Sequence, residues 1–589
     1  MQSLSADIAI VGAGGAGLRA AIAIAKTHPD LKIALISKVY PMRSHTVAAE
    51  GGAAAVTQES DSFDHHFDDT VSGGDWLCEQ DVVDYFVRAC PLEMTQLELW
   101  GCPWSRKDDG SIEVRRFGGM KIARTWFAAD KSGFHILHTL FQTSLQYPSI
   151  KRLDEHFVLD LLVDDGSIVG LVALSMMEGE LVSVTARSVI LATGGAGRVY
   201  RTNTNAAIVT GEGMGMAFRK GVALRDMEFV QYHPTGLPGS GLLISEAARG
   251  EGGVLVNKDG YRYLQDYGMG PETPLGAPRN KYMELGPRDK VSQAFWREWK
   301  AGRMIATPRG SVAHLDLRHL GRAKIMERLP FIRELAMAYA GVDPIEAPIP
   351  VRPTAHYTMG GIAVNSRTET SIKGLFAVGE CSSIGLHGAN RLGSNSLAEL
   401  LVFGRLAGEE AARNAKAALA PHDPDPLAED VKRRFLARFE QKGGENWAAI
   451  RDEMGAAMEE GCGVYRTEEQ MRKTIETLAS LKERIGRVPV SDSSSVFNTD
   501  VLSLIEVEHG LDIACAMAHS AILRRESRGA HQRLDCAERD DENFLKHSLA
   551  YYRADGALPR VEYGPVLITK SPPAKRLYGG QAEASREGG

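Results

Sequence analysis

Three features are scarce in this sequence, and each scarcity excludes a class of protein. The chain has only seven cysteines, and none of them stands in a C-x-x-C pair. Such an odd, scattered set predicts a reducing compartment and no disulfide framework, and it offers no all-cysteine ligand set for an iron–sulfur cluster. Basic residues are not in excess either, because the formal net charge is −7. Nonspecific nucleic-acid binding is therefore not expected, although a local cationic pocket remains compatible with this charge.

Long apolar runs are equally scarce. The stretch from Ile8 to Ala25 is almost continuously apolar and is interrupted only by Arg19. No basic segment precedes it and it is dense in glycine, so we interpret it neither as a signal peptide nor as a membrane span, which needs about 18 apolar residues or more. We therefore expect a chain that is soluble or peripheral to a membrane. No metal site is predicted, because His65-His66 and His135-x-x-His138 have no matching cysteine or carboxylate partners.

A dinucleotide-binding fingerprint opens the chain. The motif Gly12-x-Gly14-x-x-Gly17 follows a strand-like run over residues 7–11 and precedes an Ala-rich helical stretch. A second strand-like run over residues 32–36 completes a βαβ unit. In such a unit the glycines allow a tight turn and let the backbone approach a pyrophosphate at a helix N-terminus. The fingerprint alone fits NAD as readily as FAD.

The rest of the chain predicts several domains in an α/β fold. Two later strand–turn segments, residues 188–195 and 374–380, are typical of the remaining strands of an FAD-binding sheet. At 589 residues the chain has room for about four domains of ordinary size. We expect a discontinuous Rossmann-like FAD-binding domain, an α+β capping domain, a C-terminal helical domain and a small C-terminal extension, over residues 1–235 with 351–416, 236–350, 417–550 and 551–589.

The C-terminal third has a helical pattern. Thr467-x-x-Gln470 is a capping box, and apolar residues at helical spacing follow it up to Gly486. A second helix is predicted over about 500–525. Beyond Tyr552 we expect short strands, and residues 581–589 are predicted to form a frayed tail.

Cationic side chains stand in four glycine-flanked loops, at His233, Arg249, Arg288 and the pair His356 and Arg391. Arginine can hold a carboxylate with a bidentate fork and histidine adds further donors, so the set suits a small dicarboxylate. Pro234 favours an extended conformation for His233 and so directs its ring. A lone arginine or histidine in a loop is more often structural. The residues by themselves therefore indicate only a flavin or nicotinamide oxidoreductase that acts on an anionic substrate.

One string beside the fingerprint is far more specific. It is Tyr40-Pro41-Met42-Arg43-Ser44-His45-Thr46. With this string, and nearly end to end from Asp7 through residues 528–533 to Pro573-Ala574-Lys575-Arg576, the chain closely resembles the flavoprotein subunits of fumarate reductase and, more broadly, of succinate dehydrogenase. The resemblance implies an oxidoreductase that reduces fumarate to succinate by hydride transfer from covalently bound FAD, with an arginine as the proton donor.

The resemblance also implies roles for single residues. FAD would be attached covalently to His45. His356 and Arg391 would hold one carboxylate, while Arg249 would hold the other with His233 and Ser245. Arg288 would donate the proton through a relay with Glu246 and Arg249. The implied cofactor-binding residues are Gly12, Ala13, Gly14, Gly15, Ala16, Ile36, Ser37, Lys38, Ser44, Thr46, Glu50, Gly51, Gly52, His156, Phe157, Val158, Glu212, Glu380, Ser396 and Leu397.

Three positions depart from the family pattern. Ser245 and Glu212 stand where the family usually has Thr and Asp, and both keep the chemical group. Ala248 stands where many relatives have a reactive cysteine, which predicts poor inhibition by thiol reagents.

Partners and alternatives follow from the same resemblance. It implies an iron–sulfur subunit that carries the clusters, small membrane anchor subunits, a flavinylation assembly factor, and a peripheral position at the cytoplasmic face of the inner membrane, with no nucleic acid. Glu50 and residues 40–43 favour the reductase branch. The alternatives are a succinate dehydrogenase subunit, an L-aspartate oxidase, which lacks the flavin-linking histidine, and a flavin electron carrier without a substrate of its own.

Overall fold

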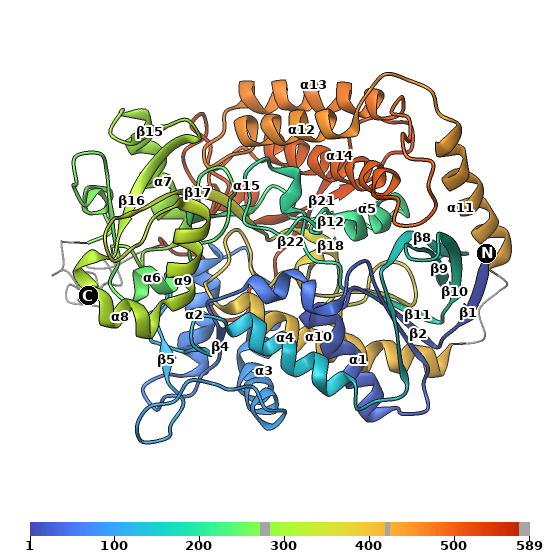
Figure 1. Cartoon of the computed structure of the whole chain (residues 1–589), viewed down its shortest axis with the longest axis horizontal. Helices are drawn as coiled ribbons and strands as arrows, with labels where there is room; N and C mark the ends of the chain where they lie inside the picture. Colours follow the sequence, from blue (N-terminus) through green and yellow to red (C-terminus); the bar gives the residue numbers. More distant parts are fainter. Residues whose placement is uncertain (271–282, 419–423, 577–589) are drawn as a thin grey trace.

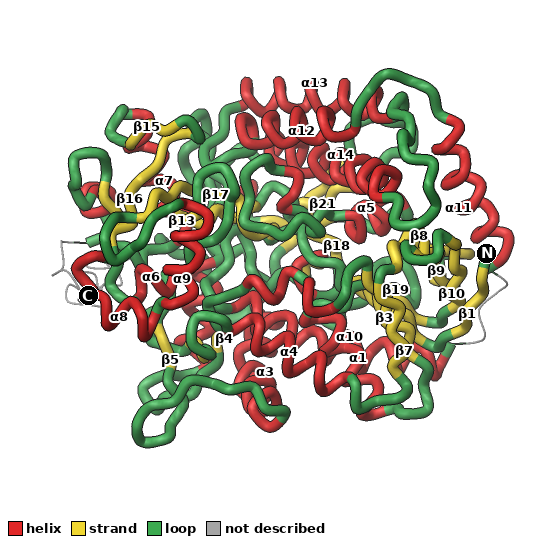
Figure 2. The backbone as a smooth tube through the Cα atoms, viewed as in Figure 1, coloured by secondary structure: helices red, strands yellow, loops and turns green. Residues whose placement is uncertain are grey.

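The computed structural model describes residues 1–270, 283–418 and 424–576 of the chain (Figure 1). The predicted tail over residues 581–589, and part of the predicted capping domain, lie outside the described residues. The architecture is α/β, as the sequence predicts. Helices α12, α13 and α14 lie in the upper part of the view and α1, α3 and α4 in its lower part, while strands β1 and β10 lie at its right and β15 and β16 at its left (Figure 2).

A five-stranded parallel sheet forms the nucleotide-binding core. Its order is β19-β11-β2-β3-β7, with bounds Leu375–Ala377, Ser188–Leu191, Ile8–Val11, Ile33–Ser37 and Ile150–Asp154. Adjacent strands pair in parallel throughout. The strands are short apolar runs because helices cover a parallel sheet, so that both faces are buried. The predicted strands over 7–11 and 32–36 are confirmed to within one residue.

Helix α1 (Gly15–Thr27) follows β2 directly and is buried from Gly15 to Ala25. The apolar run that could be mistaken for a membrane span is therefore the central βα unit of this sheet. The single charge in that run, Arg19, is buried and donates to Glu93 of α3 at 2.7 Å (Nε to Oε2). Such pairing is what a buried guanidinium needs.

The sheet over the capping segment is antiparallel, in the order β13-β17-β16-β14, and β15 pairs with β16. The bounds of these strands are Val230–Gly236, Ile349–Thr358, Gly310–Asp316, Val254–Val256 and Ile305–Thr307. A separate hydrophobic cluster, whose buried members run from Leu237 to Val351, packs against this sheet. The paired strands β13 and β17 run across both expected domain boundaries, so they connect the capping segment to the nucleotide-binding part.

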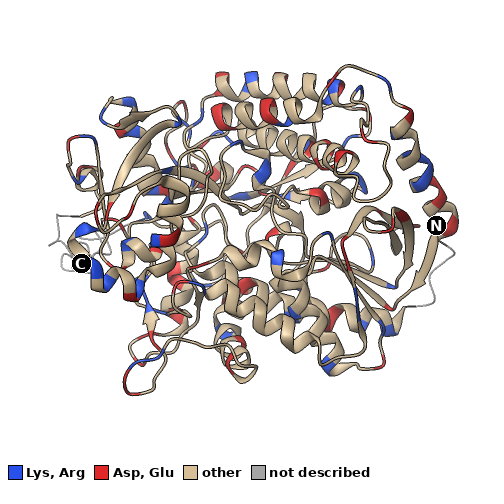
Figure 3. Ribbon diagram, in the orientation of Figure 1, with Lys and Arg blue, Asp and Glu red and all other residues tan. Residues whose placement is uncertain are grey.

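The C-terminal region is helical, as predicted. Helices α12 (Trp447–Gly461), α13 (Glu468–Ile485) and α14 (Thr499–Leu523) pack together. The predicted N-cap is confirmed, because the Thr467 side chain accepts a hydrogen bond from the Gln470 backbone N–H at 3.3 Å. Basic and acidic side chains are interleaved along α11 (Asp425–Ala437) and α13 (Figure 3).

Two C-terminal strands, β21 (Lys546–Tyr551) and β22 (Arg560–Pro565), pair in the order β20-β18-β12-β21-β22. The prediction of short strands beyond Tyr552 is confirmed by β22, whereas β21 lies before that point and was not predicted. Besides β22, β21 pairs with the short strand β12 (Leu224–Arg225), which is distant from it in the sequence. Among the described residues, no helix combines the length and apolar character needed to cross a membrane.

The remaining elements surround these cores. The helices are α2 (Phe63–Gly73), α3 (Gln80–Leu99), α4 (Ser132–Ser144), α5 (Glu212–Arg219), α6 (Glu246–Gly250), α7 (Arg288–Lys300), α8 (Gly321–Arg328), α9 (Pro330–Leu335), α10 (Asn395–Ala417) and α15 (Asp541–Phe544). The strands are β1 (Gln2–Ser5), β4 (Ala53–Ala54), β5 (Val114–Arg115), β6 (Thr125–Trp126), β8 (His156–Asp164), β9 (Ser167–Ser175), β10 (Glu180–Thr185), β12, β18 (Gly361–Ala363) and β20 (Ser382–Ser383).

Candidate active site

A cavity of about 560 Å³ runs from the fingerprint loop to the cationic loops. The β2–α1 turn, residues 44–52, β8, the 192–195 turn and the start of α10 line one part of it, and β13, α6, α7 and β17 line the other. All the site residues predicted from the sequence line this one cavity except Arg249. The sequence segments that carry them are hundreds of residues apart, so the fold brings them together.

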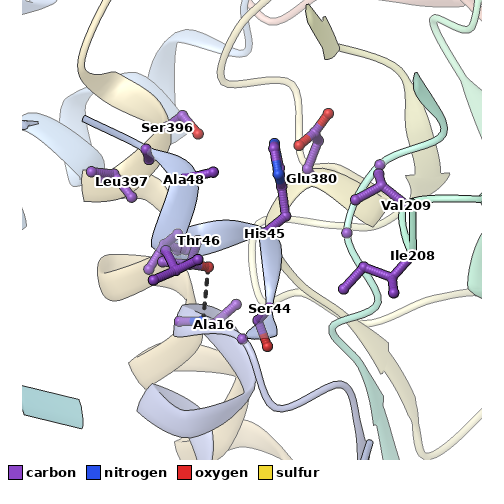
Figure 4. A pocket seen from close by; sticks show the side chains of 18 of the residues that line it. Ala16, Ser44, His45, Thr46, Ala48, Ile208, Val209, Glu380, Ser396 and Leu397 are labelled. Atoms are coloured by element: carbon purple, nitrogen blue, oxygen red, sulfur yellow. Dashed lines mark hydrogen bonds between the residues drawn. The ribbon is translucent and has the colours of Figure 1, made fainter. Parts of the chain in front are cut away.

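The fingerprint glycines leave room only for backbone. Gly12 adopts φ +109°, and a Cβ there would lie 2.2 Å from the carbonyl oxygen of Ala192. A Cβ on Gly17 would lie 1.8 Å from the carbonyl oxygen of Gly12. The start of α1 is held by Thr46, whose hydroxyl accepts the Gly15 N–H at 3.2 Å (dashed line in Figure 4). This close β2–α1 packing places the helix N-terminus at the cavity wall, where a pyrophosphate is stabilised.

At the same end of the cavity, Lys38 and Glu212 form a buried pair. The Lys38 ammonium lies 2.6 Å from Glu212 and 2.8 Å from Glu506 (Nζ to Oε1 in both cases). Burial would lower the pKa of Lys38, but the two carboxylates outweigh it and raise the pKa. Glu212 begins helix α5 and lines the cavity. A carboxylate so placed can accept hydrogen bonds from ribose hydroxyls, as the acidic residue of a nucleotide-binding fold does.

His45 lies near the middle of the cavity, on the short 3-10 turn His45–Ala48. Figure 4 shows its ring standing away from the turn, on the side of Glu380 and Val209. The ring nitrogen Nδ1 accepts the Ala206 N–H at 3.3 Å. Burial lowers the pKa of His45 to about 4, so the imidazole is neutral at physiological pH. A neutral imidazole keeps a nucleophilic nitrogen available.

Two buried arginines, Arg288 and Arg391, dominate the other part of the cavity, and one side chain joins them. The amide oxygen of Gln231 accepts from Nη1 of Arg288 at 3.1 Å and from Nη2 of Arg391 at 3.2 Å. Burial, followed by the charge of Arg288, lowers the pKa of Arg391 to about 10. Both guanidinium groups are less than a tenth exposed. Two such cations facing one cavity favour a dianionic ligand.

Two neutral histidines accompany these arginines, and the paired strands β13 and β17 set their separation. The ring centroids of His233 and His356 lie 5.0 Å apart. Nε2 of His356 accepts from Nη2 of Arg391 at 3.1 Å, while its Nδ1 lies 2.7 Å from the Thr204 hydroxyl. Burial, reinforced by the charge of Arg288, holds the pKa values of both histidines well below 6.5.

His233 has one ring nitrogen free to meet a ligand. Its Nδ1 accepts the Thr235 N–H at 3.3 Å. Its Nε2 is buried and has no hydrogen-bond partner within the described parts of the chain. Because a buried polar atom normally has a partner, this atom is available to a ligand in the cavity.

Glu246 connects Arg288 to Arg249. One carboxylate oxygen, Oε2, accepts from Nε of Arg288 at 2.9 Å and lies 3.7 Å from Nη2 of Arg249, while Oε1 accepts the Gly118 N–H at 2.5 Å. Burial would raise the pKa of Glu246, but the two guanidinium groups outweigh it and lower the pKa. Glu246 is therefore ionised and forms a continuous polar chain between the two arginines.

Arg249 is the one predicted site residue that does not line the cavity. It lies behind Glu246, fully buried, and donates to the backbone carbonyl of Glu284. Its Nη2 has no hydrogen-bond partner among the described residues. The sequence placed Arg249 with the other cationic loops. Glu246 and Arg249 are one turn of α6 apart, and this spacing brings the guanidinium of Arg249 to 3.7 Å from the Glu246 carboxylate.

Sequence reasoning missed several side chains that support the site. They are Gln231, Thr204, Asn205, Tyr357 and Glu399. Gln231 stands two residues before His233, so strand alternation was the one signal that pointed to the same face. The others become neighbours only through tertiary pairing. Within the described residues, no three His, Cys, Asp or Glu side chains are grouped as metal ligands.

Two protein families match the sequence of this chain. The family described as FAD binding domain matches residues 7–397, and that described as Fumarate reductase flavoprotein C-term matches residues 451–578. The chain is 73% identical to the fumarate reductase flavoprotein subunit of Proteus vulgaris, over 99% of this chain and 98% of that one.

A solved structure and a second, less similar relative also resemble this chain over nearly its whole length. The structure of a mutant E. coli quinol fumarate reductase superposes with a TM-score of 0.97 at 71% identity, covering 98% of this chain and 99% of that one. The succinate dehydrogenase flavoprotein subunit of Rickettsia bellii is 41% identical over 97% of this chain and 98% of that one.

Proposed function

The chain belongs to the family of fumarate reductase flavoprotein subunits, and on that premise we propose that it is the catalytic subunit of a quinol:fumarate reductase. It is an oxidoreductase that binds FAD and reduces fumarate to succinate. The observation that carries this proposal is the pair of buried arginines, Arg288 and Arg391, at one part of a cavity whose other part is a dinucleotide cradle.

The proposed direction is fumarate reduction. Identity to the fumarate reductase subunit of Proteus vulgaris is 73%, whereas identity to the succinate dehydrogenase subunit of Rickettsia bellii is 41%. The same groups bind succinate, so oxidation of succinate by this chain is the second candidate. The reaction is reversible in principle, and the potentials of the flavin and the quinone set its net direction.

The cavity fits FAD. The glycine cradle and the start of α1 would receive the pyrophosphate, and Glu212 would receive the ribose. The remaining predicted cofactor residues, from Ile36 on β3 to Leu397 on α10, line the same cavity. When bound, FAD supplies the hydride for the alkene carbon.

We assign covalent attachment of FAD to His45. Its imidazole is neutral and lines the same cavity as the cradle and the two arginines. The Ala206 N–H is bonded to Nδ1 at 3.3 Å, whereas the Asn205 amide lies farther from Nε2, at 3.5 Å, so Nε2 is the proposed attachment point. An assembly factor that promotes this attachment is part of the same proposal.

Four side chains would hold the substrate. Arg391 and His356 are bonded to each other and would bind one carboxylate together. Nε2 of His233 and the Ser245 hydroxyl, both at the cavity wall, would bind the other with help from the charge of Arg249. Neutral His233 can donate from its Nε2 without adding charge, while His356 accepts from Arg391 and orients its guanidinium. Holding the two carboxylates at separate points orients the alkene between them.

Arg288 is the proposed proton donor to the second alkene carbon. A free guanidinium loses its proton only above a pH of about 12. A developing carbanion is nevertheless a stronger base than water, so a guanidinium held beside it can donate. Glu246, which accepts from Nε of Arg288 at 2.9 Å and lies 3.7 Å from Nη2 of Arg249, would take a proton from Arg249 and pass it to Arg288, and would then be ionised again. The transfer thus uses a chain of groups that are already in contact.

The proposed partners complete an electron path. An iron–sulfur subunit would carry the clusters, and small membrane anchor subunits would hold the assembly at the cytoplasmic face of the inner membrane. The expected division into an FAD-binding domain, a capping domain over 236–350 and a helical domain is part of the proposal. It is supported by the separate hydrophobic cluster of the capping segment.

Dye-linked turnover of the purified holoprotein tests this function. A chemically reduced viologen dye is mixed with the protein, and its oxidation is followed after fumarate is added. The proposal predicts fumarate-dependent oxidation of the dye and no oxidation of L-aspartate. Oxidation of L-aspartate with no response to fumarate would support an L-aspartate oxidase instead. No response to either compound would support a flavin carrier.

A further inference from the structure

The C-terminal strap, which we define as residues 566–576, runs from β22 back toward the nucleotide-binding part. Gln80, the first residue of α3, anchors this segment through hydrogen bonds. The side-chain oxygen of Gln80 accepts the N–H groups of Thr569, Lys570 and Ser571, each at 3.0 Å. Its Nε2 donates to the Ser571 carbonyl at 2.6 Å. Gln80 is fully buried, so this segment is fixed to the domain surface and is not a loose tail.

The strap ends, within the described residues, in a buried ion pair beside the active site. Nη1 of Arg576 donates to Oδ2 of Asp289 at 2.8 Å, and its Nη2 lies 3.4 Å from Oδ1. The side chains of Arg576 and Asp289 are 8% and 2% exposed. Exposed ion pairs contribute little, whereas breaking a buried pair leaves an uncompensated charge. Loss of Arg576 would therefore leave the buried carboxylate of Asp289 without its compensating charge.

A second carboxylate completes this junction. Oδ2 of Asp75 lies 3.8 Å from Nη1 of Arg576. Asp75 and Trp76 are consecutive non-glycine residues with φ of +54° and +58°. Residues in this left-handed region are strained and persist only where their surroundings fix them, often near functional sites. Here the strap helps to fix them, because the Trp76 indole donates to the Ser571 hydroxyl at 3.2 Å.

Asp289 is also connected to both active-site arginines, Arg288 and Arg391, through the chain and through hydrogen bonds. It directly follows Arg288 at the start of α7. Its Oδ1 accepts from Nδ2 of Asn390, the residue before Arg391, at 3.5 Å. Asn390 in turn accepts from Nε2 of Gln231 at 2.9 Å, and the oxygen of Gln231 accepts from both arginines. One unbroken polar network therefore leads from the strap to the cavity.

We propose that Arg576 is a positioning residue for the reduction of fumarate. Its guanidinium neutralises Asp289 and fixes the first turn of α7, so that Arg288 keeps its position between Gln231 and Glu246. Without Arg576, the buried carboxylate of Asp289 would attract the next cations, Arg288 and Lys290, and would draw the proposed proton donor away from the cavity. This inference rests on the proposed role of Arg288.

Steady-state turnover of the assembled complex tests the proposal, with flavin content measured for every variant. Arg576→Gln should lower kcat for fumarate about tenfold or more, because a shift of about 1 Å in a positioned group can cost a hundredfold. KM should change much less, because Arg391 and His356 are untouched. Lys575→Gln is the matched control, since Lys575 is the exposed neighbour and its loss should leave kcat unchanged. Arg576→Lys keeps the cation and should restore most of the lost kcat.

Two further measurements separate positioning from a general loss of stability. The double variant Arg576→Gln with Asp289→Asn removes both charges and should turn over faster than Arg576→Gln alone. Hydrogen exchange over residues 286–296 should quicken in Arg576→Gln and not in Lys575→Gln. A double variant no faster than the single one, or unchanged exchange in that segment, would overturn the proposal.

Arg288→Ala, measured in the same assay, distinguishes a failure of the role proposed for Arg576 from a failure of the proton donation proposed for Arg288. Normal turnover of Arg576→Gln beside an inactive Arg288→Ala overturns only the role of Arg576. Normal turnover of Arg288→Ala contradicts the proposed proton donor, and the positioning role assigned to Arg576 falls with it.

Discussion

At the scale of single residues, burial decides which side chains of the cavity carry charge. His45, His233 and His356 are held neutral, while Glu246 is held ionised by two guanidinium groups. Around Arg288 and Arg391, the histidines therefore add no positive charge to that of the arginines. Arginine suits this task because its guanidinium stays charged when it is buried, whereas histidine loses its proton.

His45→Ser tests the covalent linkage. The variant should still bind FAD, because the cradle and Glu212 are unchanged, but it should not retain the flavin after denaturation. Flavin fluorescence of the protein band on a denaturing gel measures this directly. Wild-type protein made with its assembly factor should fluoresce, and the variant should be dark. A fluorescent band from the variant would place the linkage on another residue.

His547 gives a prediction for stability against pH. Burial would lower its pKa, but Asp226, at 2.6 Å from Nδ1, outweighs burial and raises the pKa above 6.5, with a further contribution from Glu79 at 3.2 Å from Nε2. A raised folded-state pKa contributes stability that is fully present below about pH 6.5, the unfolded value, and is lost as the pH rises through the folded value.

The matched variant is His547→Gln, compared with wild type by thermal unfolding. The difference in Tm should be largest below about pH 6.5 and should shrink as the pH rises through the folded-state pKa, because the wild-type histidine then loses its proton. A difference that grew with pH would contradict the raised pKa.

At the scale of elements, the close contact of β2 with α1 creates the nucleotide cradle. Gly17→Ala would place a methyl group 1.8 Å from the carbonyl oxygen of Gly12, so α1 would have to move away from the sheet. We expect the variant to lose most of its bound FAD. Gly444→Ala is the control, because a Cβ there meets no heavy atom within 4 Å. The ratio of flavin to protein absorbance measures the outcome, and normal loading of Gly17→Ala would contradict the assigned cradle.

The sequence predicted elements well where the pattern is local. Strands β2 and β3 were placed within one residue, because buried parallel strands are short apolar runs between glycine turns. The start of α13 was predicted because Thr467 and Gln470 form a local cap. β21 was missed although six of its residues pair with the nearby strand β22; only its two pairs with β12 join segments that are distant in the sequence.

The candidate site shows the same limit. The cationic loops indicated an anion site, and the family resemblance supplied the residue roles. Gln231 was missed because its bonds to Arg288 and Arg391 exist only after β13, α7 and the loop before α10 have come together. Arg249 was grouped with the cavity residues because sequence spacing does not show which member of a helical turn faces inward.

At the scale of the whole molecule, the chain should need partners to reach a quinone. Its seven cysteines are dispersed, six of them are buried, and the seventh is partly exposed. The chain alone should pass electrons between dyes and fumarate but should not oxidise menaquinol. Adding the iron–sulfur and anchor subunits should restore that activity. Menaquinol oxidation by the single chain at the rate of the complex would contradict the proposed division of labour.

The central claim is that this cavity reduces fumarate with Arg288 as the proton donor, and anaerobic stopped-flow mixing tests it most directly. Flavin is first reduced in the holoprotein, and its reoxidation by fumarate is then followed by absorbance. Arg391→Ala is the comparison variant. It should weaken the binding of fumarate by about 2–5 kcal/mol, so that a higher fumarate concentration is needed for reoxidation.

Wild-type flavin should be reoxidised rapidly. The flavin of Arg288→Ala should not be reoxidised, even at fumarate concentrations that saturate binding. Reoxidation of the Arg288→Ala flavin at the wild-type rate would contradict the role of Arg288 as the proton donor.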